Sequence, residues 1–225
     1  MEFDTSIIWQ ATPYLWEGLK FTLSLTAAAF AIGMALGIVL ALVQHLELPV
    51  FSQAAKVYVA LMRSIPLIMV LFWFFFLVPI IVGHLTGSSR PVPIGANATA
   101  YITFGLFEAA YYSEIIRTGL RAVPAGQNEA SRALSLNVFQ TYRLVILPQV
   151  IRAASPIILS QTIILFQDTS LVYVLSLTDL LGAASKMAQI NGRLVEMYLA
   201  AAAAYFVISL IASQLVEKLK RQTSR

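Results

Sequence analysis

The chain has 225 residues, of which 59% are hydrophobic and only 12% are charged, and its formal net charge at neutral pH is +4. This composition excludes an ordinary soluble domain, and apolar runs almost free of charge predict an all-α integral membrane protein. The absence of cysteine excludes disulfides, thiolate metal sites and a cysteine nucleophile. The basic residues flank the apolar runs, as topology determinants do, so we do not expect nucleic acid as a partner.

Five apolar runs are long enough to cross a bilayer, and we expect five transmembrane helices in one domain of residues 1–225. The expected spans cover residues 18–43, 56–83, 97–120, 150–177 and 194–216. Residues 84–95 and 178–193 are expected to be loops. The acidic N-terminus lacks the basic start of a cleavable signal peptide, so the first span is expected to act as its own insertion signal.

The first two spans contain residues that affect helix packing. Gly33 and Gly37 form a GxxxG step, which permits close contact with another helix. In the second span Pro66 follows Arg63 by three residues and can kink the helix. An arginine near a span end either extends to the membrane surface or has a functional role, and the sequence leaves both readings open for Arg63.

The third span carries an unusual number of polar residues: Glu108, Tyr111, Tyr112, Glu114 and Arg117. Glu114 and Arg117 are three residues apart on one helix face and can pair. Glu108 lies nine residues before Arg117 and therefore on the opposite face. The two tyrosines either pack in the bundle or shape a cavity.

Four consecutive polar residues, Gln167, Asp168, Thr169 and Ser170, interrupt the fourth span. A charge at mid-bilayer costs about 2.5–3.5 kcal/mol on insertion, so such a group faces a cavity or a partner. The polar residues of the third and fourth spans either hold helices together or line a polar pathway. Hydroxyl groups beside a broken helix suit the ammonium and carboxylate groups of an amino acid.

A polar segment, residues 121–149, separates the third span from the fourth. Apolar side chains recur in it at spacings of three and four, which predicts a helix with one apolar stripe: Ala130, Leu134, Val138, Tyr142 and Val145. The segment is either a surface helix between two spans or a docking site for a partner. Most lysine and arginine residues lie on its side of the predicted membrane, which places the segment and the C-terminus in the cytoplasm and the N-terminus outside.

Four blocks of the sequence resemble the permeases of polar amino-acid ABC transporters (the histidine, glutamate, glutamine and arginine group), and glutamate/aspartate importer permeases most closely. In the 121–149 segment, Ser135 replaces the usual glycine of their EAA loop. Glycine permits a sharp turn whereas serine tolerates a continuing helix, so the sequence leaves the bend at this position open. The other blocks are residues 63–67, 107–117 and 166–171. The residues that match the EAA loop, at the spacing of that motif, are Glu129, Ala130, Ser131, Ser135, Val145, Leu147 and Pro148.

The resemblance implies the fold of a type I ABC-importer permease, and import of a polar amino acid, glutamate or aspartate above others, across the bacterial inner membrane by alternating access. It implies four partners: a dimer of ATP-binding subunits docked on residues 121–149, a second permease subunit (a copy or a paralogue), an extracytoplasmic amino-acid-binding protein, and membrane lipid. The chain has no phosphate-binding loop, so ATP and Mg²⁺ are expected on the partner ATPase and no cofactor on this chain. The implied pathway residues are Arg63, Pro66, Glu108, Tyr111, Tyr112, Glu114, Arg117, Gln167, Asp168, Thr169 and Ser170.

Two other functions fit a helical membrane protein. An ion-coupled carrier of small polar solutes would use Asp168 as its coupling site, but the inverted repeats that favour such a carrier are not visible. An intramembrane enzyme would need a nucleophile and base or a ligand cluster. The two histidines, His45 and His84, lie in different loops on opposite sides, so no catalytic residue or metal site is predicted.

Overall fold

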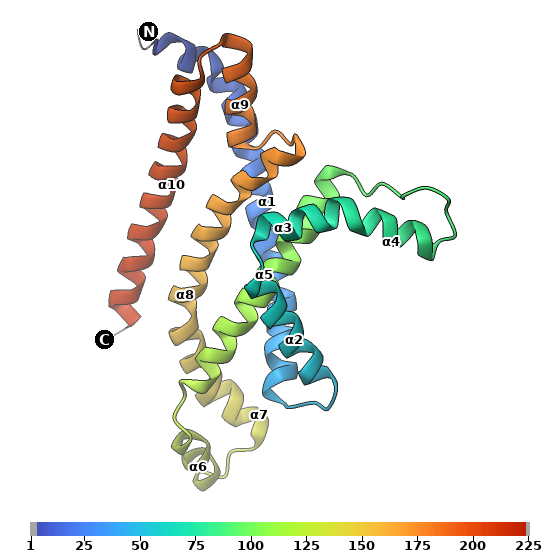
Figure 1. Cartoon of the computed structure of the whole chain (residues 1–225). Coiled ribbons are helices and arrows are strands. Elements are labelled where there is room, and N and C mark those ends of the chain that lie inside the picture. Colours follow the sequence, from blue (N-terminus) through green and yellow to red (C-terminus); the bar gives the residue numbers. More distant parts are fainter. Residues whose placement is uncertain (1–3, 224–225) are drawn as a thin grey trace.

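A computed structural model describes residues 4–223, and all regular structure in this range is helical (Figure 1). The long helices are α1 (Ser6–His45), α5 (Ala96–Arg121), α8 (Leu147–Asp168) and α10 (Leu194–Thr223). The shorter elements are α2 (Phe51–Ser64), α3 (Leu67–Phe72), α4 (Val78–Leu85), α6 (Gly126–Ala133), α7 (Val138–Thr141), α9 (Leu180–Asn191), the π-helical segments η1 (Trp73–Leu77) and η2 (Tyr142–Ile146), and the 3-10 segment η3 (Thr169–Leu175).

Four helical stretches among residues 4–223 are long and apolar enough to cross a membrane: Ser6–His45, Leu67–Leu85, Val138–Leu175 and Leu194–Arg221. The all-helical membrane protein predicted from the sequence is therefore confirmed, but the structure gives four candidate spans where five were predicted. The expected span of residues 97–120 does form a helix, α5. It does not qualify by hydropathy because two glutamates and two arginines fall within its 26 residues.

Helix α5 packs against α1 over most of its length and lies near the centre of the bundle (Figure 1). Small residues recur every fourth position on the buried face of α1, among them Ala29, Gly33 and Gly37. A Cβ atom added to Gly33 would lie 2.8 Å from the Cβ of Glu108, and one on Gly37 would lie 2.9 Å from the Cβ of Tyr112. The GxxxG step therefore lets α1 approach the part of α5 that carries the polar residues.

Replacing Gly33 by alanine should lower stability, because the added methyl group forces α1 away from α5. Overpacking of this kind costs about 1–3 kcal/mol. The apparent melting temperature of the purified protein measures the effect. Gly126→Ala is the matched control, since a Cβ atom at Gly126 meets nothing within 4 Å. Equal melting temperatures for Gly33→Ala and the wild type would show that the α1–α5 contact is not tight.

The expected span of residues 56–83 is not one helix. Its kink at Pro66 is a complete break, because Ile65 adopts an extended conformation (φ −117°, ψ 136°) that the following proline favours. Helix α2 ends at Ser64, and α3, η1 and α4 then run sideways, away from the α1–α5 pair (Figure 1). Arg63 consequently lies in the last turn of α2, beside α5.

Two further boundaries differ from the expected ones. The first helix begins at Ser6 rather than near residue 18, because the aromatic lead-in continues the helix. Residues 178–193 were expected to be a loop but contain α9. The Asp179 carboxylate caps α9 by accepting the backbone N–H groups of Leu181 and Gly182 at 3.0 and 2.9 Å, and Gly192 ends it with a φ of 67°.

Candidate docking segment and polar face

The 121–149 segment forms two short helices at one end of the molecule, at the bottom of the view in Figure 1. Helix α6 ends where Ser135 takes a left-handed φ of 57°. The backbone N–H of Leu136 donates to the carbonyl of Ser131 at 3.0 Å, and that of Ser135 donates to Arg132 at 2.9 Å. These two bonds define a Schellman motif, in which the left-handed position usually holds glycine. The bend that the sequence left open is therefore present, and Ser135 takes the place of the glycine in it.

The second half of the segment restarts as a helix at Asn137. The Asn137 side chain accepts the Gln140 N–H, and the Gln140 side chain accepts the Asn137 N–H, both at 2.9 Å. From there α7, η2 and α8 follow one another as helix from Val138 to Asp168. The single apolar stripe predicted across the segment is thus divided between two helices, and the second of these is continuous with the fourth predicted span.

The residues that match the EAA motif differ in exposure. Ser131 is buried, and its hydroxyl donates to the Gln127 carbonyl at 2.7 Å. Val145 is half-buried. The others are exposed: Glu129, Ala130, Ser135, Leu147 and Pro148. Within residues 4–223 Glu129 has no ion-pair partner.

Large apolar side chains surround this end of the chain. The exposed fractions of Leu134, Val138 and Phe139 are 74%, 75% and 70%, and that of Leu144 is 61%. These exposed apolar residues lie in the same segment as Glu129, and exposed apolar patches edged by polar groups are typical of protein-interaction surfaces.

Sequence reasoning missed two contacts that tie this segment to the rest of the bundle. His45, the last residue of α1, shares a hydrogen bond of 2.9 Å with the Tyr142 hydroxyl in η2. Gln149 in α8 donates to the Gln127 side chain of α6 at 3.4 Å and to the Val145 carbonyl at 2.8 Å. His45 was considered only as a possible catalytic residue, and no local pattern in the sequence pairs it with Tyr142.

Replacing Ser135 by glycine should stabilise the end of α6, because a left-handed residue with a Cβ atom costs roughly 1–2 kcal/mol. We expect hydrogen exchange of the Leu136 amide, which donates to Ser131, to slow by about fivefold. The β-branched variant Ser135→Val should speed it. Unchanged exchange in both variants would show that residue 135 does not determine how α6 ends.

A polar face lies where α2, α5 and α8 meet. Glu108 is buried, with 1% of its surface exposed, and its two carboxylate oxygens accept from the Gln161 side-chain nitrogen of α8 at 3.3 and 3.4 Å. Asp168 lies seven residues after Gln161 and so on the same side of α8. Gln161 carries no motif and was not among the predicted residues.

The Arg63 side chain extends from α2 toward α5. Its guanidinium lies 5.7 Å from the centre of the Tyr111 ring and 3.9 Å from the Glu114 carboxylate. Arg117 pairs with Glu114 at 2.9 Å, as the spacing predicts. Arg63, Tyr111, Glu114 and Arg117 therefore form one cluster along α5. Tyr111 lies one turn after Glu108, whereas Arg117 lies on the opposite side of the helix from Glu108.

The other predicted pathway residues lie elsewhere. Tyr112 is fully buried and bonds to Thr162 at 3.1 Å, and the Thr169 hydroxyl donates to the Phe166 carbonyl at 2.6 Å. Pro66 begins α3. Gln167 donates to Ser209 of α10 at 3.1 Å and, with Ser170, lines a separate pocket of about 440 Å³ between α8 and α10.

Long apolar helices around a central helix that buries the carboxyl group of Glu108 are typical of a membrane transport protein. The chain belongs to the family described as the binding-protein-dependent transport system inner membrane component, whose model matches residues 33–225. It is thus a transport subunit and not an enzyme.

Two relatives match almost the whole chain. The glutamate/aspartate import permease protein GltK of Escherichia coli O157:H7 is 47% identical over 223 residues, which are 99% of each chain. The probable glutamine ABC transporter permease protein GlnP of Bacillus subtilis (strain 168) is 31% identical over 230 residues, covering 99% of this chain and 100% of GlnP.

Two solved structures share the fold. A crystal structure of an amino acid ABC transporter with histidines has a TM-score of 0.88 and 30% identity, and the match covers 99% of this chain and 100% of that one. An inward-facing structure of the MetNI methionine ABC transporter has a TM-score of 0.76 at 19% identity, covering 99% and 100% of the two chains, and shows the fold alone. The predicted type I importer permease fold is therefore confirmed.

Proposed function

We propose that this chain is the membrane-spanning subunit of an ATP-driven importer of a polar amino acid, with glutamate or aspartate as the favoured substrate. The observation that carries the substrate class is the 47% identity to a glutamate/aspartate import permease over 99% of both chains. Similarity to permeases named for glutamine and cystine import supports the wider amino-acid class.

We infer five membrane spans, with α5 as the span that hydropathy does not detect. Its neighbours α1, α2 and α8 shield it, so its polar residues face protein or the pathway rather than lipid. The 121–149 segment and the C-terminal end of α10 would then lie in the cytoplasm, where their lysines and arginines are favoured, and the N-terminus outside.

The proposed mechanism is alternating access driven by a separate pair of ATP-binding subunits, which hold the ATP and Mg²⁺. These subunits would contact Glu129 and the apolar residues around it. The helical run from Val138 to Asp168 is about 45 Å long at 1.5 Å per residue, so a tilt imposed at its docking end also moves Gln161 and Asp168. The His45–Tyr142 hydrogen bond would carry the same motion to α1.

The polar face offers both signs of charge that an amino acid needs. The half-buried carboxylate of Asp168 suits its ammonium group, and the guanidinium groups of Arg63 and Arg117 suit its carboxylates. Because the Arg63 side chain is 43% exposed and Asp168 is only half-buried, we propose that a second permease subunit, a copy or a paralogue, completes the pathway. An extracytoplasmic binding protein would deliver the substrate.

Transport assays on the reconstituted complex test this function. Uptake into proteoliposomes should require ATP in the compartment that the 121–149 segment faces. Binding proteins loaded with glutamate or aspartate should stimulate it more than those loaded with histidine, arginine or glutamine. A preference for another amino acid would contradict the substrate, and uptake driven by an ion gradient without ATP would indicate an ion-coupled carrier instead.

A further inference from the structure

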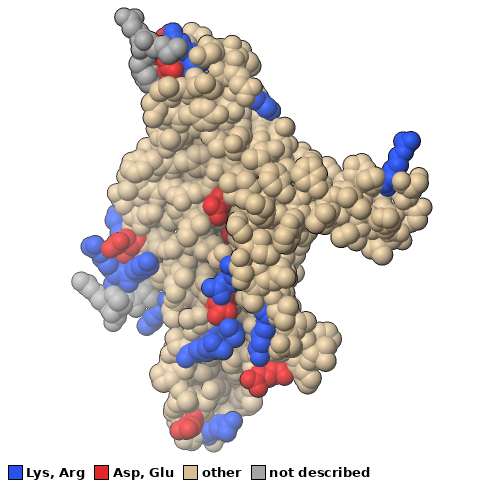
Figure 2. All heavy atoms as spheres, viewed as in Figure 1, with Lys and Arg blue, Asp and Glu red and all other residues tan. Residues whose placement is uncertain are grey.

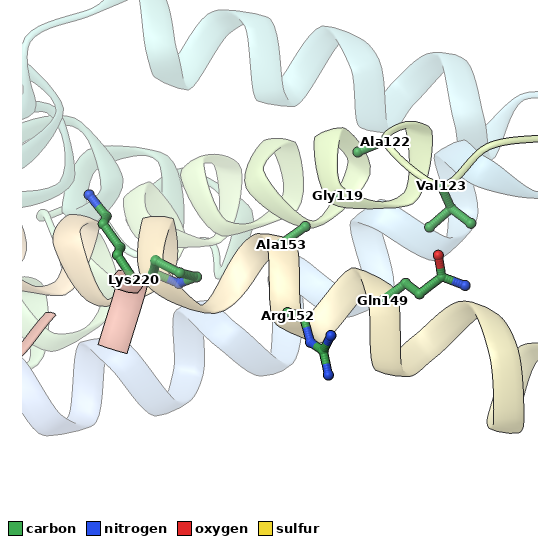
Figure 3. A pocket seen from close by; sticks show the side chains of 8 residues that line it. Gly119, Ala122, Val123, Gln149, Arg152, Ala153 and Lys220 are labelled. Carbon is green, nitrogen blue, oxygen red and sulfur yellow. The ribbon is translucent and has the colours of Figure 1, made fainter. Parts of the chain in front are cut away.

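A pocket of about 460 Å³ opens where the ends of α5, α8 and α10 meet, away from the polar face (Figure 3). Small residues leave the space: Gly119 and Ala122 at the end of α5, and Ala153 on α8. Lys220 lies at one end of the pocket and Gln149 at the other, and Arg152 stands on α8 between them, with its guanidinium pointing away from α5 in this view (Figure 3).

The pocket is cationic and its charges are not compensated. No acidic residue lines it, and within the described chain neither Arg152 nor Lys220 has an ion pair or a hydrogen bond from its side chain. The carboxylate nearest along α10, Glu217, pairs with Arg221 at 3.3 Å. Basic side chains also predominate at this end of the face shown in Figure 2. An arginine and a lysine on separate helices suit an anion with several oxygens, such as a phosphate.

An apolar groove of about 420 Å³ continues along the same two helices. Leu159 lies one turn beyond Pro156 of the cationic pocket, and Leu219 adjoins Lys220. On α10 the groove extends from Ile208 to Leu219, which is about 16 Å at 1.5 Å per residue. This length is close to half of the roughly 30 Å hydrocarbon core, and therefore to the depth of one leaflet.

The groove does not belong to the polar face. At 100° per residue, Leu159, Ile163 and Phe166 lie about 140–200° around α8 from Gln161. The groove therefore faces away from the pathway proposed above, toward the side where a span meets lipid.

We propose that the pocket and the groove together bind one anionic phospholipid. Its phosphate lies between Arg152 and Lys220, and an acyl chain lies between α8 and α10 with Leu23 of α1 at the base. The lipid bridges the end of α10 to the helix that joins the docking segment to Asp168. Only the choice of leaflet, the cytoplasmic one, rests on the proposed orientation. Lipid binding itself is independent of the transported substrate.

The test uses the full-length permease, together with any subunits that co-purify with it, in phosphatidylcholine nanodiscs. Spin-labelled phosphatidylglycerol is added, and the motionally restricted fraction gives its association constant relative to spin-labelled phosphatidylcholine. The double variant Arg152→Gln/Lys220→Gln should lower this relative constant by about thirty-fold, since each basic residue strengthens binding to an anionic lipid by roughly five- to six-fold. The matched control, Lys56→Gln/Lys218→Gln, removes two exposed cations outside the pocket and should lower it by a clearly smaller factor at physiological ionic strength, because salt screens exposed charges that do not contact the phosphate.

Two more arms identify the occupant. Ala212→Phe fills the apolar groove and should also remove the preference for phosphatidylglycerol. Inorganic phosphate at millimolar concentration should not displace the labelled lipid, because it has no acyl chain. Equal losses in the two double variants would show diffuse attraction rather than a site. Displacement by inorganic phosphate, or an unaffected Ala212→Phe variant, would overturn a lipid occupant.

Discussion

The variant Glu129→Lys is expected to abolish amino-acid uptake while the protein still inserts and folds. Glu129 is exposed on α6 with no ion-pair partner among residues 4–223, so its reversal disturbs little within the permease. At an interface, losing one partner of a desolvated charge pair costs about 2–5 kcal/mol, which corresponds to at least about thirty-fold in affinity. Deleting residues 130–135 should have the same consequence, because it removes the turn at Ser135.

Uptake and ATP hydrolysis measured together in proteoliposomes distinguish lost docking from lost folding. In Glu129→Lys, uptake should fall with the melting temperature unchanged, and ATP hydrolysis should no longer respond to loaded binding protein. Glu47→Lys is the matched control, since Glu47 is an exposed acid in the turn between α1 and α2, at the same end of the molecule. Normal uptake by Glu129→Lys, or an equal loss in Glu47→Lys, would remove the docking role from Glu129.

The second large effect is expected for Asp168→Asn, in which uptake should fall by about ten- to hundred-fold. Asp168 has no hydrogen bond or ion pair from its side chain in the described part of the chain, so its charge is available to a substrate. Hydrogen bonds to charged groups contribute about 1.5–3 kcal/mol, which gives the expected range. The change keeps the size of the side chain, so assembly should remain normal.

Asp179→Asn provides the comparison for this variant. Asp179 is a buried acid, whereas Asp168 is half-buried. Asp179 caps α9 and accepts the Tyr205 hydroxyl at 3.3 Å, and asparagine is an equally good helix cap. Uptake by Asp179→Asn should therefore stay within about threefold of the wild type. Assays over a range of concentrations of loaded binding protein give both the maximal rate and the half-saturation point. Wild-type kinetics for Asp168→Asn would exclude Asp168 from the pathway.

The fold class was predictable from the sequence because apolar runs and charge placement are local properties. The pairing of Glu114 with Arg117 was predictable for the same reason, since three residues bring two side chains together on any helix. The number of spans is less certain from local properties. Hydropathy gives only four, because α5 is held as a central helix by contacts with α1, α2 and α8 that hydropathy does not measure.

Other features depended on signals that were visible but were weighed wrongly or left open. Asp179 and Gly192 form a cap and a stop around α9, yet the glycine and asparagine content of residues 178–193 favoured a loop. At Ser135 the low intrinsic preference of serine for a left-handed φ was outweighed by the two hydrogen bonds that close the Schellman motif. The helix breaks before Pro66 because a proline disfavours the helical conformation of the residue that precedes it, here Ile65. Helix preferences assigned residue by residue do not include this effect of the next residue.

Contacts between distant segments were not predictable. Gln161 meets Glu108 across 53 positions, and His45 meets Tyr142 across 97. Neither residue stands in a motif, and only the packing of α8 and α1 around α5 brings each pair together.

Crosslinking from residue 130 tests the central claim most directly, namely that the 121–149 segment receives motion from a separate ATPase. The chain contains no cysteine, so Ala130→Cys introduces a single reactive site on the exposed face of α6. In the assembled transporter, a short thiol-specific crosslinker at this site should attach the permease to its ATP-binding subunit, and ATP should change the yield. Crosslinks to no nucleotide-hydrolysing subunit, or labelling of the site from outside intact cells, would contradict the account.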